Sequence, residues 1–171
     1  MKRGIIALIA LLLTTGCQKN SYNTFSKKYR VWYSCDITVS PFNQVTTPGR
    51  FVSVRKTGNT LYTVDSDSHK ADIELSAIQS GTYIMGLAGL IIGTPTFNND
   101  DMSVWAYDLG CPACDIASSR LTFDVKGTAT CSKCGGSWNL NASGFPINDN
   151  AQRPLYRYPV IRSDNSVTVS N

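Results

Sequence analysis

Four of the six cysteines in this 171-residue chain follow one spacing that is typical of metal ligands. Cys111 and Cys114 form a first Cys-x-x-Cys pair, and Cys131 and Cys134 form a second pair after sixteen intervening residues. Each pair places two sulfurs close enough to share a metal, and two facing pairs complete a four-sulfur site. Four thiolates suit zinc or an iron–sulfur cluster. Two disulfides are the alternative, because the N-terminal sequence predicts an oxidising compartment.

Residues 1–16 have the features of an export signal. Lys2 and Arg3 precede an unbroken apolar run over 5–13, which is too short to span a membrane. The next residues, Thr14-Thr15-Gly16-Cys17, resemble a bacterial lipobox, with Thr14 at a position where Leu is usual. The resemblance implies cleavage before Cys17, a lipid on its sulfur and a tether over residues 17–26. An ordinary signal peptide followed by a chance cysteine is the alternative.

The lipobox resemblance also predicts the location of the mature protein. We expect it to be lipid-anchored to a membrane of a bacterial cell envelope, on the extracytoplasmic side, facing the periplasm or lying on the cell surface. Without residues 1–16 the chain keeps 14 basic and 12 acidic residues. This balance gives no support for a nucleic-acid partner, and the run at 27–30 is expected to be a solvated start to the first strand. Residues 27–171 are enough for one domain.

The pattern of apolar residues in this domain predicts an all-β fold. Apolar residues recur at every second position from Val31 to Val39, which is typical of a strand with one buried face. Glycines interrupt the apolar segment 82–93 and favour buried strands packed closely on another backbone. Segment 73–78 fits a strand end or one helical turn. Further strands are predicted over 51–54, 61–64, 103–109, 121–125, 128–130, 155–162 and 167–169, with turns at Gly58-Asn59 and Lys126-Gly127.

These strands place both cysteine pairs at strand ends, joined by a hairpin. An alternating strand, Cys-Pro-x-Cys, the hairpin, Cys-x-x-Cys-Gly-Gly-Ser-Trp and a closing strand at Leu155-Tyr156 follow in that order. This order resembles the Rieske iron–sulfur domain over residues 104–170. The resemblance implies an antiparallel β-sandwich with a small metal-binding subdomain, about 108–150, whose two loops hold a 2Fe–2S cluster. It also implies an electron-transfer module with a redox partner protein, whose identity the sequence does not give.

The cysteine ligands depart from the Rieske pattern of two cysteines and two histidines. The family's histidine positions correspond to Cys114 and Cys134, and the only histidine of the chain, His69, is distant in sequence. A cluster would therefore be held by four cysteines, with Gly135, Gly136 and Ser137 placed to hydrogen-bond the sulfurs. Unfolded export prevents a cytoplasmic cluster from travelling with the chain, whereas zinc can bind after export. A non-enzymatic structural or binding module with a four-cysteine zinc site is therefore the alternative function.

The remaining candidate residues favour structural roles. Cys35 lies on the apolar face of its strand and is expected to be a buried core thiol. His69 lies in a polar segment and is expected at the surface. No acid–base pair, phosphate loop or triad is present, so we expect no catalytic residues. Two further groups are interpreted as a solvated acidic loop (Asp65, Asp67, Asp72 and Glu74) and as packing around the metal site (Trp105, Tyr107 and Trp138).

Overall fold

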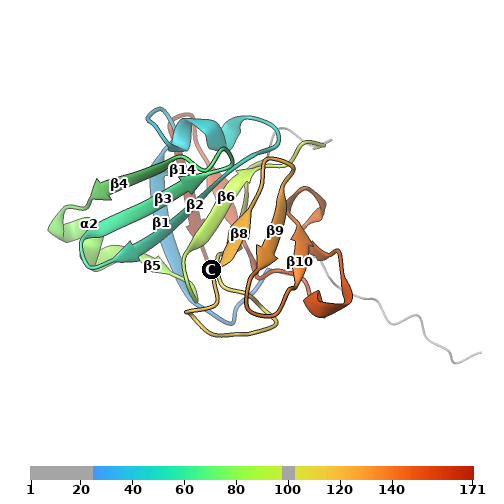
Figure 1. Ribbon diagram of the computed structural model, residues 1–171. Coiled ribbons are helices and arrows are strands. Elements are labelled where there is room, and N and C mark those ends of the chain that lie inside the picture. The colour runs from blue at the N-terminus through green and yellow to red at the C-terminus, as the bar shows by residue number, and fades with distance from the viewer. Residues whose placement is uncertain (1–24, 98–102) are drawn as a thin grey trace, which may run out of the picture.

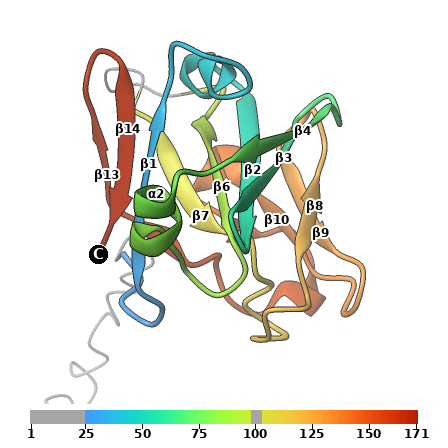
Figure 2. The same ribbon diagram turned by 90° about the vertical axis from the view of Figure 1, so that its left-hand side faces the viewer.

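Three antiparallel sheets make up the part of the chain that the computed structural model describes, residues 25–97 and 103–171 (Figure 1). The six-stranded sheet lies between the other two (Figure 2). This arrangement confirms the predicted all-β class. The six-stranded sheet has the order β12 (Arg157–Tyr158), β7 (Trp105–Asp108), β6 (Leu90–Thr94), β2 (Arg50–Thr57), β3 (Thr60–Asp65) and β4 (Lys70–Glu74).

The two outer sheets have four strands each, and short helices connect the strands. One outer sheet has the order β13 (Val160–Arg162), β14 (Ser166–Ser170), β1 (Val31–Asp36) and β5 (Ile84–Met85). The other has the order β11 (Phe145–Pro146), β10 (Ser137–Asn139), β9 (Thr128–Cys131) and β8 (Leu121–Phe123). The helices are α2 (Ala77–Thr82) and the 3-10 turns η1 (Phe42–Thr46), η2 (Leu140–Ala142) and η3 (Asp149–Ala151). No helix in the described ranges has the length and apolar character that crossing a membrane requires.

Strand β1 follows the predicted alternation over most of its length. Tyr33 and Cys35 are buried, whereas Trp32, which points to the other face of the strand, is 47% exposed. The prediction was wrong for Val39, which is 53% exposed. The strand ends at Asp36, because its carboxylate accepts a hydrogen bond from the Thr38 amide at 2.8 Å and turns the chain.

The β2–β3 hairpin confirms the predicted turn at Gly58-Asn59, where Gly58 has a φ of +58°. Both interpretations of segment 73–78 apply in part. Strand β4 continues to Glu74, and α2 then begins after Ser76, which forms a capping box with Gln79. None of the residues of α2 is buried, so this helix covers an edge of the fold without filling its core.

The glycine-interrupted segment forms one buried strand and a tight turn. All five residues of β6 are buried, and a Cβ added at Gly93 would collide with the Arg50 carbonyl oxygen of β2. The prediction that a glycine of this segment packs closely on another backbone is therefore confirmed for Gly93. The prediction of a buried strand was wrong for β5, where Ile84 is 39% exposed. Gly86 has a φ of +66° and belongs to the turn between β5 and β6.

Two separate cores form on the two faces of the six-stranded sheet. The first lies against the sheet that contains β1 and includes Tyr33, Cys35 and Tyr158. The second lies against the β8–β11 sheet and includes Tyr107, Trp138 and the sulfurs of two metal-ligand candidates. Val125 was predicted to share the buried face of β8 but is 57% exposed, because it lies in the turn that joins β8 to β9.

Candidate metal centre

The two cysteine loops follow strands of different sheets and lie at the same end of the molecule, at the bottom of Figure 1. The first loop leaves β7 after Asp108, and the second leaves β9 at Cys131. Strand β8 joins them, because Leu121 pairs with Cys131 in β9 and its amide donates to the Leu109 carbonyl at 2.8 Å. Since β8 contacts both loops, it sets the distance between them.

The structure brings all four predicted ligand sulfurs together. The Sγ atoms of Cys111 and Cys134 are 3.6 Å apart, and those of Cys114 and Cys131 are 3.9 Å apart. All four sulfur atoms lie within 4.8 Å of one another. The four cysteines are free, since a disulfide requires sulfurs about 2 Å apart. This group can therefore bind a metal ion.

The two loops have the same backbone turn. In the first, the Asp115 amide donates to the Cys111 carbonyl at 2.8 Å, and in the second the Gly135 amide donates to the Cys131 carbonyl at 2.9 Å. Asp115 and Gly135 have φ values of +57° and +71°, in the left-handed region. Glycine adopts this conformation without steric cost, whereas aspartate needs other contacts to hold it there. The matching turns present the sulfurs of the two loops to one point.

Backbone amides direct hydrogen bonds at the sulfurs. The Cys114 amide donates to the Cys111 sulfur at 3.4 Å. Burial acts to raise the pKa of the Cys131 thiol, but the amides of Cys134 and Lys133 favour its thiolate and leave the pKa below its ordinary value. Burial raises the pKa of Cys111 and of Cys134, and a hydrogen bond from the Gly136 amide opposes this effect at Cys134. A bound metal would overcome the burial effect, because its ligands bind as thiolates.

The three residues that follow the second pair differ in what they contact. Gly136 is the one whose amide reaches a sulfur, that of Cys134. The Gly135 amide is used by the backbone turn, and the Ser137 hydroxyl lies 3.5 Å from the Thr130 hydroxyl. Gly136 also has no room for a side chain, since a Cβ there would lie 2.6 Å from the Trp138 ring. Its small size therefore allows the loop to pack on the indole.

Asp115 is held by residues from both ends of the domain, which sequence reasoning missed. Its carboxylate pairs with the Lys28 ammonium and accepts hydrogen bonds from the hydroxyls of Tyr29 at 2.9 Å and Tyr156 at 2.8 Å. The hydrogen bond from Lys28, followed by that from Tyr156, lowers the pKa of Asp115 to about 2. Lys28 is therefore not a simply solvated residue. These contacts stabilise the left-handed conformation of Asp115, directly after the candidate ligand Cys114.

Asp108 is a second residue that sequence reasoning missed. It is fully buried, and its two carboxylate oxygens accept four hydrogen bonds. The donors are the amides of Leu87 at 2.7 Å, Ala88 at 3.2 Å and Gly110 at 2.7 Å, and the Tyr158 hydroxyl at 2.7 Å. Burial raises the pKa of Asp108, and these hydrogen bonds oppose the rise. Asp108 therefore fixes the start of the first metal loop to the β5–β6 turn and to β12.

All three aromatic residues predicted to pack around the site lie in or against the second core. Trp138 is fully buried in the second core, and its indole N–H donates to the Arg153 carbonyl at 2.8 Å. Tyr107 is also buried, and its hydroxyl donates to the Leu140 carbonyl at 3.0 Å. Trp105 is half-buried, and its ring lies 4.5 Å from the Arg157 guanidinium. Cys35 belongs to the other core and is not part of the cysteine group.

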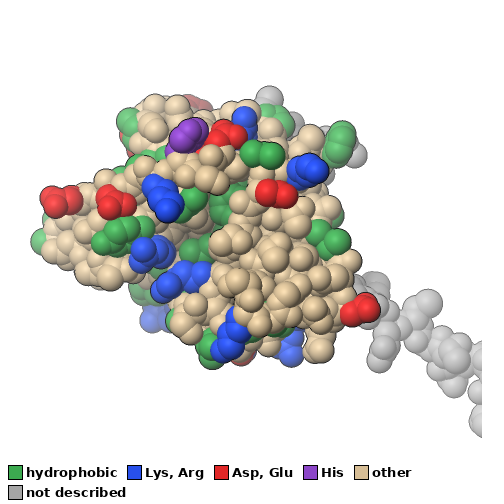
Figure 3. Space-filling view, viewed as in Figure 1, with side chains coloured by type: hydrophobic (Ala, Val, Ile, Leu, Met, Phe, Trp, Pro, Cys, Tyr) green, Lys and Arg blue, Asp and Glu red, His purple; other side chains and the backbone are tan. Residues whose placement is uncertain are grey.

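Asp65 ends β3 and Asp67 lies in the β3–β4 turn, whereas Asp72 and Glu74, the other two residues interpreted as an acidic loop, lie in strand β4. The Asp65 carboxylate is buried and accepts hydrogen bonds from Gln44 and from the amides of Asp67 and His69. His69 is 79% exposed and lies at the surface (purple in Figure 3), with its Nδ1 3.1 Å from an Asp65 oxygen. Asp67 pairs with Arg50 at 2.7 Å. These contacts account for the cluster as a turn that the chain's own donors satisfy.

The predicted lipid attachment residue, Cys17, and the export signal lie outside the described residues. The last two residues of the predicted tether are bound to the domain. The Ser26 amide donates to the Arg157 carbonyl at 2.7 Å, and the Phe25 ring lies 5.4 Å from the Arg157 guanidinium. No protein-family model, curated protein or solved structure matches this chain. The interpretation of the cysteine site therefore depends on its geometry.

Proposed function

We propose that the four thiolates bind one tetrahedral metal ion, with zinc as the resident metal, in a non-enzymatic module. The distances between the sulfurs carry this proposal. With zinc–sulfur bonds of about 2.3 Å, the sulfurs of a regular tetrahedron are about 3.8 Å apart. The shortest separations, 3.6 Å and 3.9 Å, lie on either side of this value, and no pair exceeds 4.8 Å. A 2Fe–2S cluster divides four thiolates between two irons, so thiolates on different irons must be further apart.

The donor set also fits a site without its own catalytic chemistry. Catalytic zinc sites keep one position open for water or substrate, whereas four protein sulfurs close the coordination sphere. Four thiolates and one Zn²⁺ leave a net charge of −2 at the site. The amides that point at the sulfurs of Cys111, Cys131 and Cys134 offset part of this charge.

The role of the metal is to order the two loops. Few apolar side chains come from the loops themselves, so they cannot bury enough surface to order on their own. Binding free energy then becomes folding free energy for this part of the domain. Removing the metal should increase amide hydrogen exchange in residues 109–120 and 131–137. Strands β1, β2 and β3 should keep their protection, because they pack in the other core or on β6.

An electron-transfer module with a 2Fe–2S cluster and a redox partner protein is the second candidate. The position of both loops at the ends of one hairpin, as in the Rieske resemblance, favours it. The sulfurs of Cys114 and Cys134 are only partly buried, which suits electron exchange with a partner. Replacing two histidines by thiolates adds negative charge and should lower the reduction potential toward about −400 mV.

Metal analysis of protein purified without oxygen separates the two candidates. A colourless protein with one zinc per chain supports the single-ion site. A brown protein with iron and acid-labile sulfide overturns it and supports the cluster. Cys111→Ser should abolish stoichiometric metal binding in either case. Cys35→Ala is the matched control and should keep the full metal content, because Cys35 lies in the other core.

The location of the module rests on the sequence of its N-terminus. We propose that a lipid on Cys17 anchors it on the extracytoplasmic side of a bacterial envelope membrane. The chain enters the domain beside β12, where Phe25 and Ser26 contact Arg157, so Cys17 precedes the first residue that contacts the domain by eight positions. Full-length protein should partition into detergent, and Cys17→Ala should either be released into the aqueous phase or remain unprocessed with its apolar signal attached. A Cys17→Ala protein that is processed normally and still partitions into detergent would contradict the lipid anchor.

A further inference from the structure

A cavity of about 170 Å³ lies at the outer edge of the six-stranded sheet, where β12 is the last strand. Arg157 and Tyr158 of β12 line it together with Trp105 of β7. Phe25, the first residue that the structure describes, and Val160 of β13 also line it. None of these residues belongs to the cysteine group, so the cavity is separate from the metal centre.

The Arg157 guanidinium is the only charged group among the described residues that line this cavity. It stacks on aromatic rings, since its Cζ lies 4.5 Å from the centre of the Trp105 ring and 5.4 Å from that of the Phe25 ring. Within the described ranges no carboxylate pairs with Arg157, and its buried Nε has no acceptor. The cavity wall therefore holds a positive charge that these residues do not neutralise.

Two of the three nitrogens of this guanidinium remain available to a ligand. The Nε atom is buried, so a molecule in the cavity cannot reach it. The Nη1 and Nη2 atoms also have no partner in the described part of the chain, but they keep contact with solvent because Arg157 is only partly buried. Together they form the end of a planar fork, which matches the two oxygens of one carboxylate.

The composition of the wall selects a monoanion that carries an apolar group. Arg157 supplies one positive charge, and no second basic side chain of the described residues lines the cavity. A phosphate dianion would therefore keep an uncompensated charge, whereas a carboxylate matches both the charge and the fork. The side chains of Phe25, Trp105 and Val160 offer apolar surface to the rest of the ligand. One ring fits the volume, since an apolar cavity of about 150 Å³ holds benzene.

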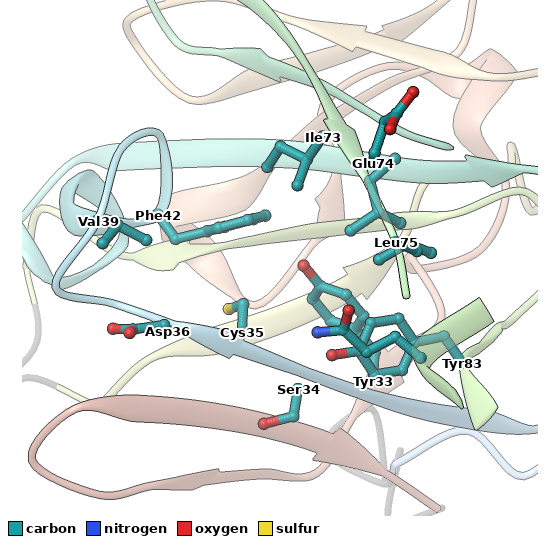
Figure 4. A pocket seen from close by; sticks show the side chains of 12 residues that line it. Tyr33, Ser34, Cys35, Asp36, Val39, Phe42, Ile73, Glu74, Leu75 and Tyr83 are labelled. Carbon is teal, nitrogen blue, oxygen red and sulfur yellow. The ribbon is translucent and has the colours of Figure 1, made fainter. Parts of the chain in front are cut away.

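A larger cavity beside β1, of about 210 Å³, has the opposite charge character (Figure 4). Its lining is mostly apolar and includes Cys35, Phe42 and Leu75. The charged residues that line it are Asp36 and Glu74, which both repel a carboxylate. This cavity therefore serves as an internal control for binding of an anion at Arg157.

We propose that the cavity at Arg157 binds a small carboxylate with one aromatic or branched aliphatic group, held end-on by Nη1 and Nη2. The rings of Trp105 and Phe25 orient the guanidinium before the ligand arrives, so little side-chain entropy is lost on binding. The partly buried setting makes this ion pair stronger than one in open solvent. The proposal stands or fails independently of the metal, because the two sites share no residue.

Benzoate and benzamide test the proposal, because they have similar shapes and only benzoate is charged. Titrations at neutral pH and constant ionic strength, followed by amide NMR shifts, should place benzoate at Trp105 and Arg157 with millimolar affinity and leave Cys35 unshifted. Benzamide should bind at least tenfold more weakly. Arg157→Met removes the fork but keeps an apolar stem on Trp105. It should lower the benzoate affinity at least tenfold, to that of benzamide, as expected for the loss of charge-assisted hydrogen bonds.

Two further variants make the result specific. Arg157→Lys keeps the charge without the fork, so it should bind benzoate more weakly than wild type but more tightly than Arg157→Met. It is the deciding variant if Arg157→Met does not fold. Arg55→Met is the matched control, because the Arg55 guanidinium also stacks on a ring, that of Tyr62 at 4.2 Å, but lines neither cavity. It should leave benzoate binding unchanged.

Three results would overturn the carboxylate site. The first is that benzoate at tens of millimolar shifts no residue of the cavity. The second is that benzamide binds as tightly as benzoate, since the charge of Arg157 would then contribute nothing. The third is that Arg55→Met weakens benzoate binding as much as the Arg157 variants do, which would show non-specific attraction to a basic protein.

Discussion

The substitution Asp108→Asn tests the buried carboxylate that fixes the start of the first metal loop. One oxygen of Asp108 accepts from the amides of Ala88 and Gly110, and the other accepts from the Leu87 amide and the Tyr158 hydroxyl. Asparagine keeps the shape of the side chain but replaces one acceptor oxygen by a donor NH₂. Two of the four hydrogen bonds must therefore be lost or reversed.

The cost follows from which donors can adapt. The Tyr158 hydroxyl can rotate and accept a hydrogen bond from the new NH₂, whereas the backbone amides cannot. The favoured orientation therefore turns the NH₂ toward Tyr158 and keeps the oxygen on Gly110. The Leu87 amide is then left without an acceptor, and a buried unpaired donor costs about 1–3 kcal/mol. Because asparagine is neutral and easier to bury than a carboxylate, we expect a loss of unfolding free energy toward the lower end, about 1–2 kcal/mol.

Denaturant unfolding of the metal-loaded protein measures this loss. The matched control is Asp124→Asn, because Asp124 is exposed and uses one oxygen to accept from the amides of Lys126 and Thr128. Asparagine can make both of those bonds, so the control should stay within about 0.5 kcal/mol of wild type. If Asp108→Asn were as stable as Asp124→Asn, the four hydrogen bonds to the buried carboxylate would add no net stability to the fold.

Three further predictions address other parts of the fold. Cys35→Ala should leave the metal content unchanged and cost on the order of 1 kcal/mol in denaturant unfolding, because it truncates a core residue outside the metal site; loss of metal would place Cys35 among the ligands. Gly93→Ala should cost about 1–3 kcal/mol or more in thermal or denaturant unfolding, since its Cβ would collide with the Arg50 carbonyl oxygen; wild-type stability would show that β2 and β6 can separate freely. The Lys28 hydrogen bond lowers the pKa of Asp115 from its ordinary 3.8 to about 2, so the stability that this carboxylate adds should be present above about pH 4 and be lost as the pH falls to 2. Unfolding curves of wild type and Asp115→Asn should therefore converge over that range, and a constant difference down to pH 2 would contradict the depressed pKa.

Local sequence signals determined the strands and the ligand set. Alternation marked Tyr33 and Cys35 as buried, and Gly58-Asn59 marked a two-residue turn, because side-chain period and turn chemistry act between near neighbours. Past the end of β1 the alternating pattern still held for Ile37 but failed further along the chain. Val39 and Val125 fit the pattern but lie in turns, since Asp36 and the β8–β9 connection end the strands first.

The spacing of the cysteines likewise determined which sulfurs meet, because a Cys-x-x-Cys turn brings its two sulfurs together within four residues. The distances between the two pairs were decided by the tertiary structure. Strand β8 contacts both loops and sets the separations of 3.6 Å and 3.9 Å between sulfurs of different pairs. The Cys-x-x-Cys spacing by itself is the same in a site for one metal ion and in a site for a cluster of two irons.

Contacts between distant parts of the chain could not be found in the sequence. Lys28 and Asp115 are 87 residues apart, and Asp108 and Tyr158 are 50 apart. Neither pair has a local pattern, because Asp108 and Tyr158 meet only when β7 and β12 pair in the six-stranded sheet, and Lys28 and Asp115 lie in loops that only the folded chain brings together. The sequence by itself determined the ligands and the buried faces, and only the tertiary structure decided how far apart they lie and what they contact.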